Sequence, residues 1–94
     1  MIKIMIERHI APTLEIPYEE RARNVLQTAV KSPGFISGET YRNAQDPNHR
    51  FLISTWRSLA DWKRWESSLE RRVMMEPLFP MMDREERITT LEFS

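Results

Sequence analysis

The chain has no cysteine, no excess of either charge and no long hydrophobic run. Without cysteine, disulfides, thiolate metal sites and a cysteine nucleophile are excluded. Fourteen basic residues balance fourteen acidic ones, so nothing indicates electrostatic binding to nucleic acid or to an anionic membrane. Lys3, Glu7 and Arg8 interrupt the apolar N-terminal stretch MIKIMIERHI, which is atypical of a signal peptide or a membrane span. We expect a soluble cytoplasmic protein without a nucleic-acid or membrane partner.

What the chain does contain is sufficient for one modest core. Its 94 residues are 40% hydrophobic, a proportion that fits a globular protein and argues against disorder. A domain of this size buries roughly 60–70% of the surface of its unfolded chain. No linker, repeat or low-complexity segment divides the sequence, so we predict a single domain over residues 1–94.

Hydrophobic periodicity in the first half of the chain predicts a strand, a helix and a hairpin. Isoleucine at every second position predicts a strand over residues 2–10. An apolar stripe from Tyr18 to Val30, behind Pro17, predicts a helix that the pair Pro33-Gly34 ends. Residues 35–43 and 50–56 then predict two strands, because the turn cluster AQDPNH separates them.

The second half predicts another helix and a last strand. Ser58, with Asp61 three residues later, resembles a capping box at the start of the helix. The apolar stripe of this helix comprises Leu59, Trp62, Trp65, Leu69 and Val73. The doublet Ser67-Ser68 is a candidate break, and the helical region ends before Pro80. The segment ERITTLEF, residues 86–93, predicts the fourth strand.

The resulting order βαββαβ predicts an α+β, ferredoxin-like sandwich, in which helices cover one face of an antiparallel four-stranded sheet. A sheet covered on one side should have a polar second face. Here both faces of the first strand are partly apolar, with Ile4 and Ile6 on one face and Met1 and Met5 on the other. We therefore expect a second copy to cover the free face in a homodimer. The alternative is a monomer with scattered exposed apolar residues.

Three segments resemble the antibiotic biosynthesis monooxygenase family: MIKIMIERHIAPTLE, KSPGFISGETYRN and FLISTWRSLADWKRWESSLER. The resemblance covers nearly the whole chain and implies a dimeric α+β barrel. The resemblance defines the function of the chain less narrowly than its fold. The family includes cofactor-independent monooxygenases of quinols and polyketide aromatics, haem-degrading enzymes, and members without known activity, so the site has to be argued separately.

The haem-degrading branch of the family uses an Asn late in the first strand, a Trp in the second helix and a later His as the iron ligand. The resemblance places these positions on Glu7, Trp65 and Met75, so only the Trp is kept. A thioether usually supplements a His ligand and does not replace it. Haem degradation is disfavoured, and we expect no metal and no organic cofactor.

A cofactor-independent oxygenase needs an apolar slot, a proton acceptor and donors that hold an enolate. Glu7 and His9 share one face of the first strand and are the candidate catalytic residues, as proton acceptors near neutral pH. We expect a cavity between this strand and the second helix, where Trp65 stacks on a planar aromatic ligand. The candidate substrate-binding residues are Trp65, Met75, Met74 and Tyr41.

Each candidate also has a structural interpretation. Glu7 can pair with a basic neighbour, His9 can be solvated, and Met74 and Met75 can fill space beneath the helix. Trp56 and Trp62 are expected in the core. Two functions remain open: oxygenation of a small aromatic or quinol-like molecule, or a non-catalytic ligand-binding or structural dimer of the same fold.

Overall fold

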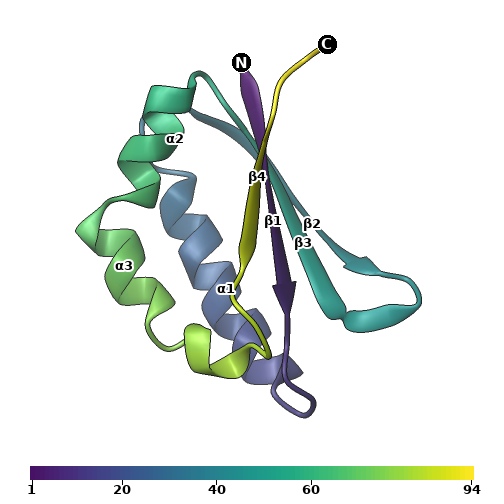
Figure 1. Cartoon of the computed structure of the whole chain (residues 1–94). Helices are drawn as coiled ribbons and strands as arrows, with labels where there is room; N and C mark the ends of the chain where they lie inside the picture. The colour runs from purple at the N-terminus through teal and green to yellow at the C-terminus, as the bar shows by residue number, and fades with distance from the viewer.

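A four-stranded antiparallel sheet forms one layer of the molecule, and the helices form a second layer against one face of it (Figure 1). The computed structural model describes all residues from 1 to 94. Along the chain the elements are β1 (Ile2–His9), α1 (Glu15–Ala29), β2 (Phe35–Asn43), β3 (Asp46–Trp56), α2 (Leu59–Glu66), α3 (Leu69–Met75), the 3-10 turn η1 (Phe79–Met81) and β4 (Arg87–Leu91). The strand order β2-β3-β1-β4 confirms the predicted ferredoxin-like α+β fold.

Helix α1 buries the stripe that its sequence predicts. Tyr18, Val25 and Ala29 are buried, one to two turns apart on the sheet-facing side, whereas Val30 is exposed beyond the end of the helix. Gly34 follows with a φ of 88°, a conformation that L side chains rarely adopt. A Cβ at this position would also collide with the side chain of Asp61 on α2, so the turn into β2 requires glycine.

The second helical region is broken at the serine doublet. The Ser58 hydroxyl accepts a hydrogen bond from the backbone N–H of Asp61 and caps α2, and the Ser68 hydroxyl accepts one from Arg71 and caps α3. The predicted stripe is confirmed only at Trp62 and Trp65, which are buried, whereas Leu59 at the start of α2 is 44% exposed. Leu69 and Val73 are 69% and 54% exposed, because α3 starts on a new axis and turns other side chains inward.

The core lies between the two layers. Alternating residues Ile4, Ile6 and Ile10 point from the first strand towards the helices and are almost completely buried. All three tryptophans, together with Met75 and Leu78, complete this cluster. None of the helices is long and apolar enough to span a membrane.

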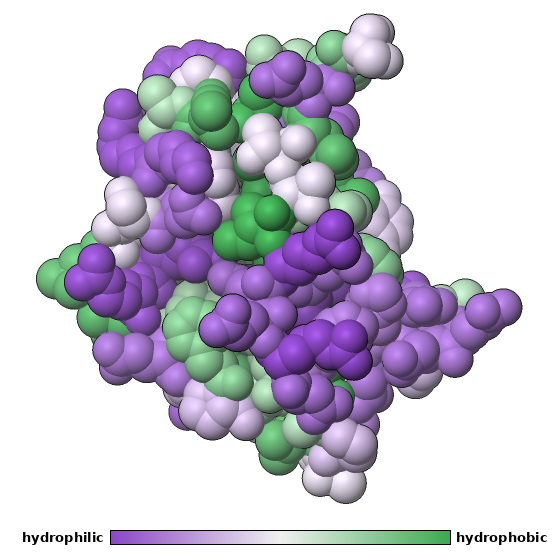
Figure 2. Space-filling model, viewed as in Figure 1, coloured by the Kyte–Doolittle hydropathy of each residue, from purple (hydrophilic) through white to green (hydrophobic).

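The other face of the sheet carries no helix (Figure 1). The strand register places Met5 opposite Ile53, Glu7 opposite Phe51 and His9 opposite His49, and all six side chains belong to this open face. Met5, Phe51 and Ile53 are only partly buried in a single chain. The hairpin between β2 and β3 protrudes and is covered by hydrophilic side chains (Figure 2).

Candidate functional site

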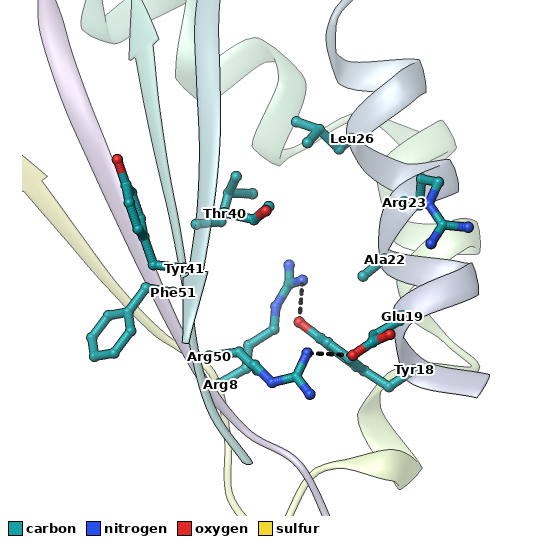
Figure 3. A pocket seen from close by; sticks show the side chains of 11 residues that line it. Arg8, Tyr18, Glu19, Ala22, Arg23, Leu26, Thr40, Tyr41, Arg50 and Phe51 are labelled. Carbon is teal, nitrogen blue, oxygen red and sulfur yellow. Dashed lines mark hydrogen bonds and ion pairs between the residues drawn. The ribbon is translucent and has the colours of Figure 1, made fainter. Parts of the chain in front are cut away.

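A cleft of about 340 Å³ lies between α1 and the helix-facing side of β2 and β3 (Figure 3). Ala22 and Leu26 on α1 and Leu52 on β3 supply apolar walls. Tyr18 and Arg8 contribute polar groups that meet in its interior. A concave, mostly apolar site with a few convergent polar groups is the usual form of a small-molecule pocket.

Arg8 is the charged residue at the centre of the site. It follows Ile4 and Ile6 on the inward face of β1 and is 4% exposed. Its Nε donates to Glu86 Oε2 at 3.0 Å, its Nη1 donates to the Tyr18 hydroxyl at 3.2 Å, and its Nη2 lies 3.8 Å from Met75 Sδ. The side chain is therefore held by α1, by α3 and by the segment that precedes β4.

Glu86 is shared between two buried guanidinium groups. Its other carboxylate oxygen accepts from Arg71 Nη2 at 3.0 Å. Burial acts to raise the pKa of Glu86, but the charges of Arg8 and Arg71 outweigh it and hold the pKa below its ordinary value. Burial likewise acts to lower the pKa of Arg8, and the opposing influence of Tyr18 and Glu86 raises it overall. The lowered pKa of Glu86 and the raised pKa of Arg8 both favour the charged forms of this pair.

An ion pair bridges the mouth of the cleft. Arg50 on β3 donates to Glu19 on α1 at 2.9 Å, and its guanidinium lies 5.9 Å from the centre of the Tyr18 ring. The Glu19 carboxylate is 43% exposed, so one end of this bridge faces solvent. Glu19 is the only carboxylate among the side chains that line the cleft.

The three tryptophans form the floor beneath the cleft. Trp56, Trp62 and Trp65 are 1%, 2% and 5% exposed, and all three line an inner cavity of about 20 Å³. Arg8, Leu26 and Leu52 line both spaces, which makes them neighbours. A void of this size holds a single water-sized molecule at most. The inner void is therefore too small for an aromatic ring, and the three tryptophans are packed in the core beside the cleft.

The structure separates the predicted catalytic residues from the predicted substrate-binding ones. Trp65 and Met75 lie inside, beside Arg8, and Met74 packs partly buried against the same core. Glu7 and His9 project from the open face: Glu7 Oε2 is 3.1 Å from His49 Nε2, and the His9 ring stacks on His49 with a centroid distance of 4.3 Å.

The predicted cavity joining Glu7 and His9 to Trp65 is wrong. Successive side chains of a strand point to opposite faces, and the residue between Glu7 and His9, Arg8, is the one that faces the helices. Tyr41 is displaced for the same reason. It borders the cleft from β2, but its ring projects to the open face beside Phe51 and is half exposed (Figure 3).

Sequence reasoning missed Arg8, Tyr18 and Arg50. A signal for Arg8 was present, since it continues the alternation of Ile4 and Ile6 and so belongs with the buried set. The spacing of Tyr18 places its ring on the apolar stripe of α1 and gives no information on where its hydroxyl points. Arg50 alternates with Leu52 and Trp56, but Phe51 and Ile53 make the other face of the strand apolar too, so the sequence alone does not assign Arg50 to the helix-facing side.

Comparison with known families gives one match over most of the chain. The family model described as antibiotic biosynthesis monooxygenase matches residues 1–77. A comparison with the sequences of curated proteins finds no significant match.

Solved structures share the fold at low sequence identity. A crystal structure of an antibiotic biosynthesis monooxygenase has a TM-score of 0.90 at 13% identity, with 100% of this chain and 99% of that chain covered. A conserved protein from Methanosarcina mazei Go1 has a TM-score of 0.92 at 14% identity, covering 99% and 92%. The cofactor-independent oxygenase SnoaB from Streptomyces nogalater has a TM-score of 0.87 at 11% identity, covering 98% and 91%. These similarities concern the fold alone.

Proposed function

The chain belongs to the antibiotic biosynthesis monooxygenase family, and on this premise we propose that it oxygenates a small planar aromatic or quinol-like molecule without a metal or organic cofactor. The cleft between α1 and the sheet carries the proposal. Its walls of Ala22, Leu26 and Leu52 suit a flat apolar ring, and its polar groups converge at one place inside. The name of SnoaB, a cofactor-independent oxygenase with the same fold, supports this reaction class.

The chemistry requires no redox group from the protein. An electron-rich substrate that has lost a proton transfers one electron to dioxygen, and the resulting radical pair combines to form a carbon–oxygen bond. For an anthrone-type substrate, protonation of this peroxide and loss of water convert the ring CH₂ carbon into a carbonyl. One atom of dioxygen enters the product and the other leaves as water, so a four-electron oxidation of carbon balances the reduction of dioxygen.

The residues of the cleft would assist this reaction by holding the ring, excluding water and accepting the first proton. Apolar walls keep the reactive anion away from bulk solvent. We assign the role of proton acceptor to Glu19, because it is the carboxylate that lines the cleft. Glu7 and His9, the acceptors that the sequence suggests, lie on the other side of the sheet.

Haem degradation is not supported by the arrangement of these residues. The Met75 thioether is fully buried and lies against the Arg8 guanidinium, so an iron ion at this sulfur would meet a fixed positive charge. Glu7, at the position of the family's Asn, faces away from Trp65. The two positions cannot contact one haem within the cleft.

Ligand binding without turnover is the second candidate. The observation in its favour is the composition of the cleft, in which a single half-exposed carboxylate paired with Arg50 is the only acidic group. Such a site could retain a planar ligand and lack an effective base. Oxygen consumption distinguishes the two functions.

The experiment is oxygen uptake with a panel of hydroquinones and anthrones, in the presence of a metal chelator. We expect uptake above the protein-free rate for at least one planar substrate, and loss of that excess in Ala22→Phe, which fills the cleft from α1. Glu20→Phe places the same ring on the exposed side of α1 and should retain it. Uptake equal to the protein-free rate across the panel would reject the oxygenase and leave the binding function.

A further inference from the structure

Two buried donors in the cleft have hydrogen-bonding capacity that the protein does not use. A guanidinium has five N–H groups. The hydrogen bonds of Arg8 occupy three of them, and one of these goes to the weak sulfur acceptor of Met75. The Tyr18 hydroxyl accepts from Arg8, and its own proton has no acceptor within the protein. Both side chains are more than nine-tenths buried, at 4% and 6% exposure, and both line the cleft.

The charges around the cleft are unbalanced, although those of the whole chain cancel. The basic and acidic side chains that line the cleft or pair with Arg8 behind it are Arg8, Arg23, Arg50, Arg71, Glu19 and Glu86. Four guanidinium groups therefore face two carboxylates, an excess of two positive charges. Part of this excess is buried at Arg8 and Arg71, which share one carboxylate. A buried charge without a full partner is costly, and an anionic ligand would relieve that cost.

We propose that the cleft binds its ligand as an oxyanion, a phenolate, enolate or aromatic carboxylate whose oxygen accepts hydrogen bonds from Arg8 and from the Tyr18 hydroxyl. Arg8 and the Tyr18 hydroxyl meet inside the cleft (Figure 3), so the apolar walls would receive the ring and these two donors the negative oxygen at its end. The inference rests on the proposed function in that it concerns the same cleft. Binding of an oxyanion does not require that the ligand is oxygenated. For an oxygenase substrate it has a direct consequence, since the form of the molecule that reduces dioxygen is the one held by these donors.

The test is a binding measurement with ligands that cannot be oxygenated. 2-Naphthoate and 2-naphthamide have the same ring system, and only the first carries a negative charge. Isothermal titration should show that naphthoate binds at least about tenfold more tightly than naphthamide, because hydrogen bonds to charged groups are the stronger kind. Tyr18→Phe should weaken naphthoate binding by about tenfold and leave naphthamide binding nearly unchanged.

Ser67→Ala is the control, because it removes an exposed hydroxyl that lies outside the cleft and donates only to the Lys63 carbonyl. It should leave both affinities unchanged. Equal affinity for the two ligands, absence of naphthoate binding, or an unaltered naphthoate affinity in Tyr18→Phe would overturn the proposal. Naphthoate binding without oxygen uptake on the hydroquinone and anthrone panel would reject the oxygenase alone, and uptake without preference for the anion would reject the oxyanion site alone.

Discussion

Arg8, Glu86 and Arg71 form a buried network in which one carboxylate is bonded to two guanidinium groups, each at 3.0 Å. The network joins β1 to α3 and to the residue that precedes β4. Breaking a buried ion pair by removing one partner is costly because the other charge remains without compensation. At the scale of single residues, the network thus links the stability of the fold to the geometry of the cleft.

The network should make the protein sensitive to acid. The folded-state pKa of Glu86 is below its ordinary value of 4.5, so the unfolded chain takes up this proton at a higher pH than the folded one. The stabilisation is complete above that ordinary value and is lost as the pH falls through the folded-state pKa. Urea unfolding at several pH values should show Glu86→Gln to be less stable by about 3–5 kcal/mol at neutral pH, with a shallower acid dependence. Parallel pH profiles for the two proteins would contradict this role.

Trp62 and Trp65 should both contribute to the stability of the fold. Both are at least 95% buried in the same core, and replacing a core tryptophan by alanine costs about 3–5 kcal/mol. This differs from the sequence-based expectation that Trp65 stacks on a ligand whereas Trp56 and Trp62 belong to the core. Phe93→Ala is a control, because Phe93 is 77% exposed and should change unfolding by less than about 0.5 kcal/mol. An unfolding midpoint of Trp65→Ala equal to that of the wild type would restore the earlier assignment.

The sequence predicts part of the buried set and part of the site. Alternation in β1 and helical spacing at Trp62 and Trp65 identify core positions, because burial follows the period of the element. The position of Glu7 and His9 relative to Trp65 depends on which strand face receives the helices. Ile4 and Ile6 contain that information. Chemical type alone selects Glu7 and His9 as candidate bases. The alternation of the strand puts their side chains on the face of the sheet opposite to Trp65.

At the scale of elements, the serine doublet determines how the second helical region covers the sheet. Ser67 lies after the end of α2, and Ser68 caps α3, so two short helices replace one. The break resets the helical register, which explains why α3 buries Arg71 and Met75 and exposes Leu69 and Val73. The sequence indicates the break through Ser67-Ser68. The new direction of α3 is set by its packing against α1 and could not be deduced from local spacing.

The two serines should differ in their contribution to stability. Ser68→Ala removes the acceptor for the backbone N–H of Arg71 and should cost about 1 kcal/mol, as the loss of an N-cap does. Ser67→Ala removes only an exposed hydroxyl that donates to the Lys63 carbonyl, and should change stability by less than about 0.5 kcal/mol. Chemical denaturation of both variants measures the difference. Equal effects would show that the cap does not define the start of α3.

At the scale of the whole molecule, the helices leave one face of the sheet open. Met5, Phe51 and Ile53 form an apolar column on that face, with the His9–His49 stack at its end. An antiparallel sheet with two apolar faces is usually covered on both sides. We propose that a second copy of the chain covers this column in a two-fold homodimer, as the sequence predicts.

Light scattering at micromolar concentration tests the dimer. We expect twice the 11.3 kDa mass of one chain. A sheet-to-sheet interface should bury more than about 1,000 Å², which is the area of interfaces that persist in solution. Ile53→Lys places a charge in the centre of the column and should give the mass of one chain. Wild-type protein with a mass near that of a single chain would refute the sheet-to-sheet dimer.

The central claim is that dioxygen is incorporated into a planar substrate held in the cleft between α1 and the sheet. Mass spectrometry of the product formed under isotopically labelled dioxygen, from the panel substrate with the greatest uptake, tests it most directly. We predict one labelled oxygen atom per product molecule with the wild type and with Glu20→Phe, and loss of protein-dependent product with Ala22→Phe, whose ring occupies the cleft. A product without labelled oxygen, or equal labelling in the presence of Ala22→Phe, would contradict the claim.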